Sequence, residues 1–174
     1  MELEIQIRNA EFSCRCCGEC CSGNDNEVMV SPDEIDLLCE ATGLTPDQIA
    51  EPYPEWIHDQ GAIFTFGRVL RRGEDGNCMF LKNNRCTVYE HRPHICRTYP
   101  FMLNGKELLV FECCGCKTGT PTPDAALNAQ DLLTRREAED KEFLLTKEQY
   151  QKHSMVLGST IIFDSRGAHQ HKRQ

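Results

Sequence analysis

The sequence lacks an excess of basic residues: 27 Asp and Glu stand against 19 Lys and Arg, giving a formal net charge of −8. A dedicated nucleic-acid binder normally carries a basic face, and a polybasic membrane anchor needs clustered lysine and arginine. The first eight residues contain no apolar core of a signal peptide, and no stretch approaches 18 uncharged apolar residues. We therefore expect a cytoplasmic protein that binds neither nucleic acid nor membranes.

Several enzyme motifs are missing as well. The spacing Cys-x3-Cys-x2-Cys of radical enzymes is not completed, because Cys16 and Cys20 would need a cysteine where Gly23 stands. There is no glycine-rich dinucleotide fingerprint and no Walker-type phosphate loop. The sequence thus argues against a self-contained radical enzyme, dehydrogenase or ATPase.

Cysteine, in contrast, is abundant, with 12 in 174 residues. In a secreted chain this density would indicate a disulfide framework. In a reducing compartment, where thiols stay free, it indicates metal ligation or redox chemistry. Metal binding is the prediction that follows.

The densest cysteine run is Cys14-Arg15-Cys16-Cys17-Gly18-Glu19-Cys20-Cys21. Cys14, Cys17 and Cys20 are each separated by two residues, as are the first three ligands in bacterial ferredoxin runs. Gly18 suits a tight loop around a metal because it can adopt positive φ. The fourth ferredoxin position is Asn24, so further ligands must come from elsewhere in the chain.

Two blocks of the sequence resemble a known family. Phe12-Ser13-Cys14-x-x-Cys17-Gly18-x-Cys20-Cys21 is similar to the opening of the YkgJ-like cysteine-cluster family, a zinc- or iron-chelating domain. The second block comprises Gly76-x-Cys78-x-Phe80-Leu81 and Cys86-x-Val88-Tyr89-Glu90-x-Arg92-Pro93-x-x-Cys96-Arg97-x-Tyr99-Pro100-Phe101. A downstream cysteine among Cys113, Cys114 and Cys116 forms the third part, so the resemblance covers roughly residues 12 to 116.

The resemblance implies a set of metal ligands, namely Cys14, Cys17, Cys20, Cys21, Cys78, Cys86 and Cys96, plus one of the downstream group. From that group we assign Cys113 and Cys116, whose Cys-x-x-Cys spacing could pair with Cys14 and Cys17 as in a zinc ribbon. Cys16, Cys39 and Cys114 are extra cysteines, either ligands of a second or larger cluster or buried thiols. Cys39, on the inner side of a predicted helix, fits a core thiol.

The identity of the metal stays open between two alternatives. Eight motif cysteines suit one or more iron–sulfur clusters of the 4Fe-4S type or larger, and they also suit two tetrahedral zinc sites. Adjacent pairs such as Cys20-Cys21 are awkward for one tetrahedral ion and easier for a multi-iron core. We therefore favour iron–sulfur, with zinc as the alternative.

Two arginines near Cys96 are candidate cofactor-binding residues. Arg92 and Arg97 could offset thiolate charge and donate hydrogen bonds to sulfur. The alternative is that they pair with Glu90 or cap backbone carbonyls.

These features predict an iron–sulfur protein acting in electron transfer or as a cluster carrier with a larger redox enzyme. The alternatives are an accessory protein for the maturation of another metalloenzyme and a zinc-stabilised interaction module. Any enzymatic role would be that of an iron–sulfur oxidoreductase component. A protein partner, either a redox enzyme or a maturation complex, is expected in the first two cases.

The predicted fold class is α+β: a small single domain with short strands, metal-pinned loops and a helical C-terminal region. We expect a metal-binding domain over 1–121, a helical extension over 122–164 and a flexible tail over 165–174. Ser31-Pro32-Asp33-Glu34 predicts a helix start with a capping box, and Gly43 its end. Further predicted elements are a strand over 3–7, a short helix from Thr45, strands at 62–66 and 69–70, a hairpin over 78–89, a strand over 108–111, a long helix from Thr122 with another from Thr146, and a strand over 160–163.

Overall fold

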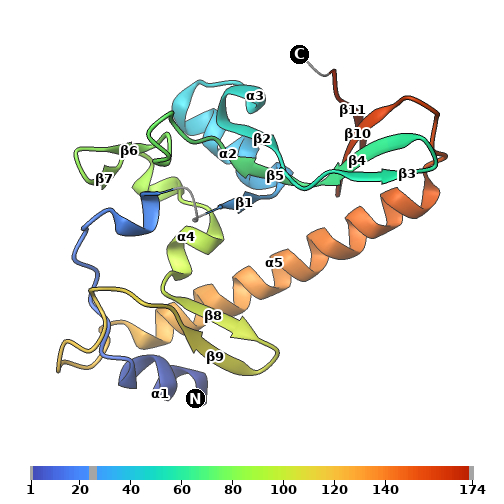
Figure 1. The fold of residues 1–174 in the computed structure, drawn as a ribbon. Coiled ribbons are helices and arrows are strands. Elements are labelled where there is room, and N and C mark those ends of the chain that lie inside the picture. Colours follow the sequence, from blue (N-terminus) through green and yellow to red (C-terminus); the bar gives the residue numbers. More distant parts are fainter. Residues whose placement is uncertain (1, 24–26, 173–174) are drawn as a thin grey trace. The chain divides into compact units, whose positions relative to one another are not determined.

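The computed structural model describes residues 2–23 and 27–172. The chain forms two compact units, each made of two separate stretches. Unit 1 comprises Met1–Ser22 and Phe80–Ala138, and unit 2 comprises Gly23–Met79 and Glu139–Gln174. Helices and short strands occur in both, which confirms the predicted α+β class (Figure 1).

Unit 1 contains two β-hairpins and mostly short helices. One hairpin joins β6 and β7 through Asn83 and Asn84, which both have positive φ, as a tight two-residue turn requires. The other joins β8 to β9, of which only the second strand was predicted. The elements are α1 (Glu2–Asn9), η1 (Glu19–Cys21), β6 (Leu81–Lys82), β7 (Arg85–Cys86), η2 (Tyr89–His91), α4 (His94–Thr98), β8 (Phe101–Asn104), β9 (Glu107–Val110) and the first half of α5 (Ala125–Lys152).

The N-terminal segment is helix α1, so the strand predicted over 3–7 is wrong. Its apolar residues alternate with period two, but Leu3 and Ile7 are also four residues apart and share one face of a helix. Ile7 is fully buried whereas Ile5, which a strand would place on the same face, is 54% exposed. An Arg8–Glu4 ion pair of 2.9 Å spans one helical turn. In so short a window the helical pattern could not be told from the strand pattern.

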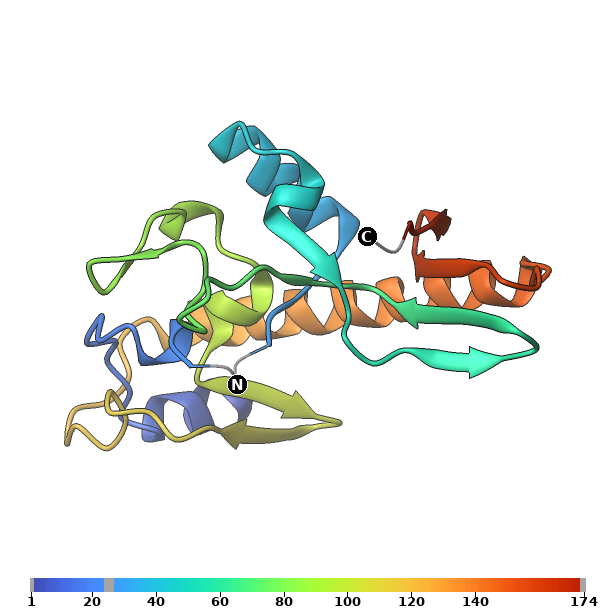
Figure 2. The same ribbon diagram turned by 45° about the horizontal axis from the view of Figure 1, so that its top comes forward.

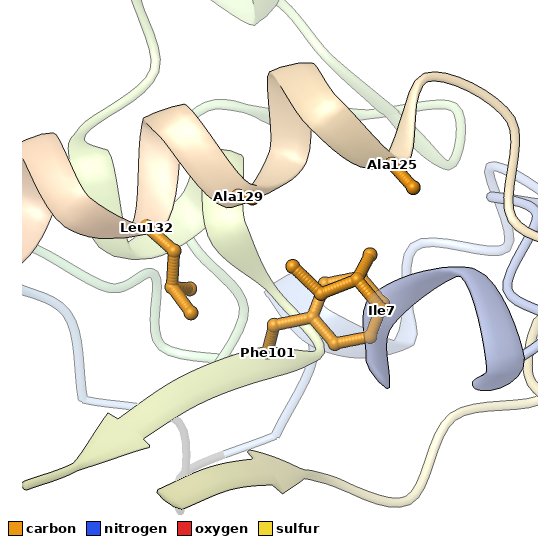
Figure 3. Packing of buried hydrophobic residues seen from close by; sticks show 5 residues of the cluster. All are labelled: Ile7, Phe101, Ala125, Ala129 and Leu132. Carbon is orange, nitrogen blue, oxygen red and sulfur yellow. The ribbon is translucent and has the colours of Figure 1, made fainter. Parts of the chain in front are cut away.

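The core of unit 1 lies between α1, β8 and the first turns of α5. Figure 3 shows Ile7 and Phe101 facing Ala125, Ala129 and Leu132. The ring of Phe12 meets that of Phe101 edge to face, at 5.5 Å between centroids. This core supports the chain segments that lead into and out of the cysteine loops.

A buried polar contact joins α5 to α4, the helix that carries Cys96. Arg135, only 7% exposed, donates from Nη1 to Thr98 Oγ1 at 3.0 Å. Since buried polar groups are costly without partners, this bond fixes the end of α4.

Unit 2 contains a three-stranded sheet in the order β1-β5-β2 and a four-stranded sheet in the order β11-β10-β4-β3. Strand β10 is parallel to β4, and the other neighbours are antiparallel; Figure 2 shows β3 and β4 as a hairpin. The elements are β1 (Met29–Val30), α2 (Pro32–Thr42), α3 (Pro46–Ile49), β2 (Ala50–Pro52), β3 (Ile57–Asp59), β4 (Ala62–Phe66), β5 (Arg68–Leu70), β10 (Thr160–Asp164) and β11 (Gly167–Gln170).

The predicted caps of α2 are confirmed. Glu34 N donates to Ser31 Oγ, and Ser31 N donates to Glu34 Oε2, which completes the capping box. At the other end Gly43 adopts φ +72 and its N–H donates to Cys39 O.

Helix α5 runs without a break to Lys152, so the separate helix predicted from Thr146 is wrong. The Thr146 hydroxyl lies 3.3 Å from Glu142 Oε1, one turn earlier, and therefore does not cap a new helix start.

The stretch predicted as a flexible tail contains strand β11, which pairs with residues Ile161–Asp164 of β10. Strand β10 itself covers the strand predicted over 160–163. Asp164 Oδ1 accepts from the backbone N–H groups of Arg166 and Gly167 and so closes the turn between the strands. This segment lacks the apolar alternation that predicts a strand, because the strand is held by backbone pairing with β10.

None of the helices in the described part of the chain combines the length and apolar character needed to cross a membrane.

Candidate metal centre

The loop of the first cysteine run is shaped by Gly18. This buried residue has φ +79 and precedes η1, in which Cys21 N donates to Gly18 O at 2.9 Å. A Cβ at Gly18 would lie 3.3 Å from Leu81 Cδ1 and 3.4 Å from Asn84 Cα. The loop thus packs on the β6–β7 hairpin, whose second strand carries Cys86, and the positive φ favours glycine here.

The downstream cysteines lie in a second tight turn, over Cys113–Cys116. Cys116 N donates to Cys113 O at 3.0 Å, and Gly115 N lies 3.4 Å from Cys113 Sγ. The two cysteine segments are joined because Ser13 N donates to Gly115 O at 2.9 Å. Gly115 is buried, and a Cβ there would lie 2.6 Å from Ser13 O.

Gly115→Ala should therefore separate the two cysteine segments. The added methyl group cannot fit against the Ser13 backbone, and overpacking of this kind costs about 1–3 kcal/mol. We expect a lower free energy of unfolding and a reduced metal content. Denaturant unfolding and metal analysis measure the two effects, with Thr120→Ala as control because that residue is exposed in the same stretch of chain. Equal stability and metal content in both variants would contradict the proposed packing role.

One close pair of sulfurs joins the two segments. Cys17 Sγ and Cys114 Sγ are 3.4 Å apart, and the neighbouring Cys20 and Cys21 sulfurs are 3.8 Å apart. Glu19 adds a carboxylate: one of its oxygens and the sulfurs of Cys17 and Cys114 all lie within 4.8 Å of one another. None of the 12 cysteines forms a disulfide.

The crowding changes the acidity of individual thiols. The pKa of Cys114 is raised to about 11, mainly because its S–H is bonded to Cys17, and further by burial and the negative charges of Cys17 and Glu19. The pKa of Cys20 is lowered to about 6, mainly by a hydrogen bond from Cys21, with Arg92 contributing a favourable charge. A thiolate is the form that binds metal, so the lowered pKa favours the metal-binding form of Cys20.

Partial burial raises the pKa of Cys14 and of Cys116, with added repulsion from Cys16 and Cys113 respectively. Each of these two thiols thus lies near other thiols whose negative charge disfavours its own ionisation.

Tyr99 lies near several of these thiols. In the sequence it was noted only as a member of the second block of the family resemblance. Burial raises the pKa of its phenol, and the charges of Cys113, Cys20, Cys116 and Glu19 raise it further. Its hydroxyl donates to Glu112 O at 2.7 Å. Tyr99 thus marks the place where the two cysteine segments converge.

The two predicted arginines differ in their contacts. Arg97 donates to the carbonyls of Arg92 and Glu90, which agrees with the carbonyl-capping alternative. Arg92 donates from Nε to Tyr89 O and stacks over the Tyr89 ring at 3.5 Å, while its charge lowers the pKa of Cys20. Arg92 is therefore the better placed to offset thiolate charge; cofactor binding by either arginine stays a prediction.

The remaining predicted ligands occupy different places. Cys86 in β7 and Cys96 in α4 belong to unit 1, whereas Cys78 belongs to unit 2, where it forms an isolated bridge with Arg72. Cys39 is half-buried in α2 of unit 2, away from any cysteine motif in sequence. Ligation by Cys78, Cys86 and Cys96 stays a prediction.

Glu19 and Cys114 were not among the ligands predicted from the sequence. Cys113 and Cys116 were preferred for their two-residue spacing, yet it is Cys114 whose sulfur meets Cys17. The only signal was the position of Glu19 between Cys17 and Cys20 within a tight loop.

The donor set fits zinc or iron. Thiolates are the preferred ligands of Zn²⁺ and of iron–sulfur clusters. Two sulfurs bound to one tetrahedral zinc at about 2.3 Å lie about 3.8 Å apart, close to the spacing of the Cys17–Cys114 and Cys20–Cys21 pairs. The residues can thus hold metal without large rearrangement of these pairs.

Comparison with known families agrees with this chemistry. Residues 13–117 match the CxxCxxCC family, described as a "Putative zinc- or iron-chelating domain". The matched region contains the first cysteine run, both hairpins of unit 1 and the turn at Cys113–Cys116. No curated protein and no solved structure was found to match the chain.

Proposed function

The chain belongs to this zinc- or iron-chelating cysteine-cluster family, and from that premise we propose that it binds an iron–sulfur cluster, of the 4Fe-4S type or larger. We propose further that it acts in electron transfer, or as a cluster carrier, for a larger redox enzyme in the cytoplasm. The observation that supports this most is the convergence of two cysteine segments, over 14–21 and 113–116, around Tyr99. Together they carry more thiols than one tetrahedral ion can bind.

Each part of the centre has a physical role in this proposal. The thiolates of the two segments would hold iron, and the cluster would supply one-electron chemistry. Arg92 places a positive charge near Cys20 and offsets the accumulated thiolate charge. Gly18 and Gly115 let the two loops approach their neighbours closely enough to present the sulfurs.

A zinc-stabilised interaction module is the second candidate, favoured by the 3.4 Å separation of the Cys17 and Cys114 sulfurs. Ligands of different irons in one cluster point to separate corners, whereas sulfurs this close suit a single ion. In that case the metal would stabilise the two loops and carry no electrons.

Metal and sulfide analysis of anaerobically purified protein tests the choice. We expect a brown protein with equal amounts of iron and acid-labile sulfide, and an EPR signal after reduction. The full-length chain with Cys39→Ser serves as control, because loss of a half-buried thiol in α2 should leave the spectrum unchanged. A colourless protein with stoichiometric zinc and no sulfide would overturn the iron–sulfur proposal and support the zinc module.

A further inference from the structure

Glu19 lies between two ligand cysteines and beside a third. It is the first residue of η1, directly after Gly18, whose φ of +79 turns the chain back on itself. Within residues 2–23 and 27–172, Glu19, Cys17 and Cys114 form the one group of three potential metal ligands whose donor atoms all lie within 4.8 Å of one another. This group of three ligands therefore includes a carboxylate, which the cysteine motif alone does not predict.

The three groups are mutually repulsive in their metal-binding forms. Two thiolates and a carboxylate would place three negative charges within 4.8 Å. A divalent cation at their centre replaces this repulsion with attraction to each group. The backbone already holds the three together, through the Gly18 turn and the bond from Ser13 N to Gly115 O.

We propose that Cys17, Cys114 and Glu19 form a mixed sulfur–oxygen site for a single divalent cation, zinc or ferrous iron. The inference rests on the proposed metal-binding role of these thiols, but not on assembly of an iron–sulfur cluster. Binding displaces the two thiol protons to solvent, and the metal undergoes no redox change. Three protein ligands leave one position of a tetrahedral ion open.

The position of the donors makes this ion accessible. Glu19 and Cys114 are exposed, and Cys17 is half-buried. A carboxylate is a harder ligand than thiolate and selects zinc or ferrous iron less strongly than a third cysteine at this position would. The site thus suits a metal that is loaded and released, as a carrier requires, rather than one that only holds the fold.

Cadmium-113 NMR tests the ligand set directly, because the resonance shifts with the number of sulfur ligands. We would titrate the full-length, metal-free, reduced protein with ¹¹³Cd²⁺ alone. We expect one resonance characteristic of mixed sulfur and oxygen ligands, which Glu19→Gln shifts or removes and Cys114→Ser removes. Glu112→Gln, which makes the same charge change at an exposed residue next to Cys113, should leave it in place.

Affinity gives a second measure. Competition with a chromophoric chelator should show that Glu19→Gln weakens binding of one Zn²⁺ per chain by at least about tenfold, since even residues that only orient ligands contribute that much. Unchanged resonances and Zn²⁺ affinity in Glu19→Gln, with unchanged circular dichroism, would overturn the proposal. So would equal weakening in Glu112→Gln, which would indicate a general charge effect.

The outcome is separable from that of the iron–sulfur proposal. A protein without sulfide that still shows the Glu19-dependent resonance would support the mixed site and reject the cluster. If the purified protein contains iron and sulfide, but the ¹¹³Cd resonances of the metal-free protein are unchanged by Glu19→Gln, the cluster is supported and the mixed site is rejected.

Discussion

Cys17→Ser is expected to weaken metal binding by at least about a hundredfold, because it removes a thiolate ligand and not merely a residue that orients one. Cys17 is the cysteine whose sulfur meets the downstream segment, 3.4 Å from Cys114 Sγ. A serine hydroxyl stays protonated near neutral pH and is a poor ligand for zinc or iron. Chelator competition on the reduced protein measures the affinity, and metal analysis of the purified protein measures occupancy.

The matched control is Cys39→Ser. Cys39 is half-buried in α2 of unit 2 and belongs to no motif, so its replacement should leave metal affinity within about twofold of the original. If Cys17→Ser and Cys39→Ser retain metal equally, the assignment of Cys17 to the centre is refuted. Circular dichroism of both variants separates a local loss of ligand from unfolding.

The second large effect is expected at Phe101, which is 2% exposed at the centre of the unit 1 core. Phe101→Ala removes the ring that contacts Phe12 and leaves a cavity beside Ile7, at a cost of about 3–5 kcal/mol in the free energy of unfolding. Because Phe12 lies only two residues before Cys14, metal affinity should fall together with stability. Denaturant unfolding of the metal-free and metal-bound protein measures both.

Phe143→Ala is the control for this substitution. Phe143 is 66% exposed on α5, so loss of its ring should cost well under half as much. An equal loss of stability in the two variants would contradict the core described between α1, β8 and α5.

The elements that sequence predicted well are those whose signals are local. Ser31, Pro32 and Glu34 specify a helix start within four residues, and Gly43 specifies its end; the structure has both. Strands β4 and β10 were predicted from short apolar runs, because these contain β-branched and aromatic residues that suit buried strands.

The errors arose where one pattern fits two structures. Leu3, Ile5 and Ile7 satisfy strand periodicity, but Leu3 and Ile7 also satisfy helix periodicity. Packing of Ile7 against Phe101 and α5 selected the helix. Thr146 resembled a helix start, but α5 continues through it and its hydroxyl meets Glu142 instead. Strand β11 was hidden in a polar tail, since its stability comes from pairing with β10 and not from its side chains.

For the centre, the chain's composition and spacing were sufficient to indicate the chemistry. Cysteine abundance, the spacing of Cys14, Cys17 and Cys20, and Gly18 in the loop together predict thiolate-bound metal, and the family match agrees. The type of metal ligand depends only on which side chains are present, and a tight loop depends only on residues next to one another in the sequence. Both features can therefore be predicted without knowledge of the tertiary structure.

Which donors meet one another was decided by tertiary structure alone. Cys17 and Cys114 are 97 positions apart, and their contact depends on the bond between Ser13 N and Gly115 O and on the core that holds Phe12. The placement of Glu19 beside both sulfurs depends on the same approach of two distant loops. No local pattern encodes this contact, because it follows from how α1, β8 and α5 pack.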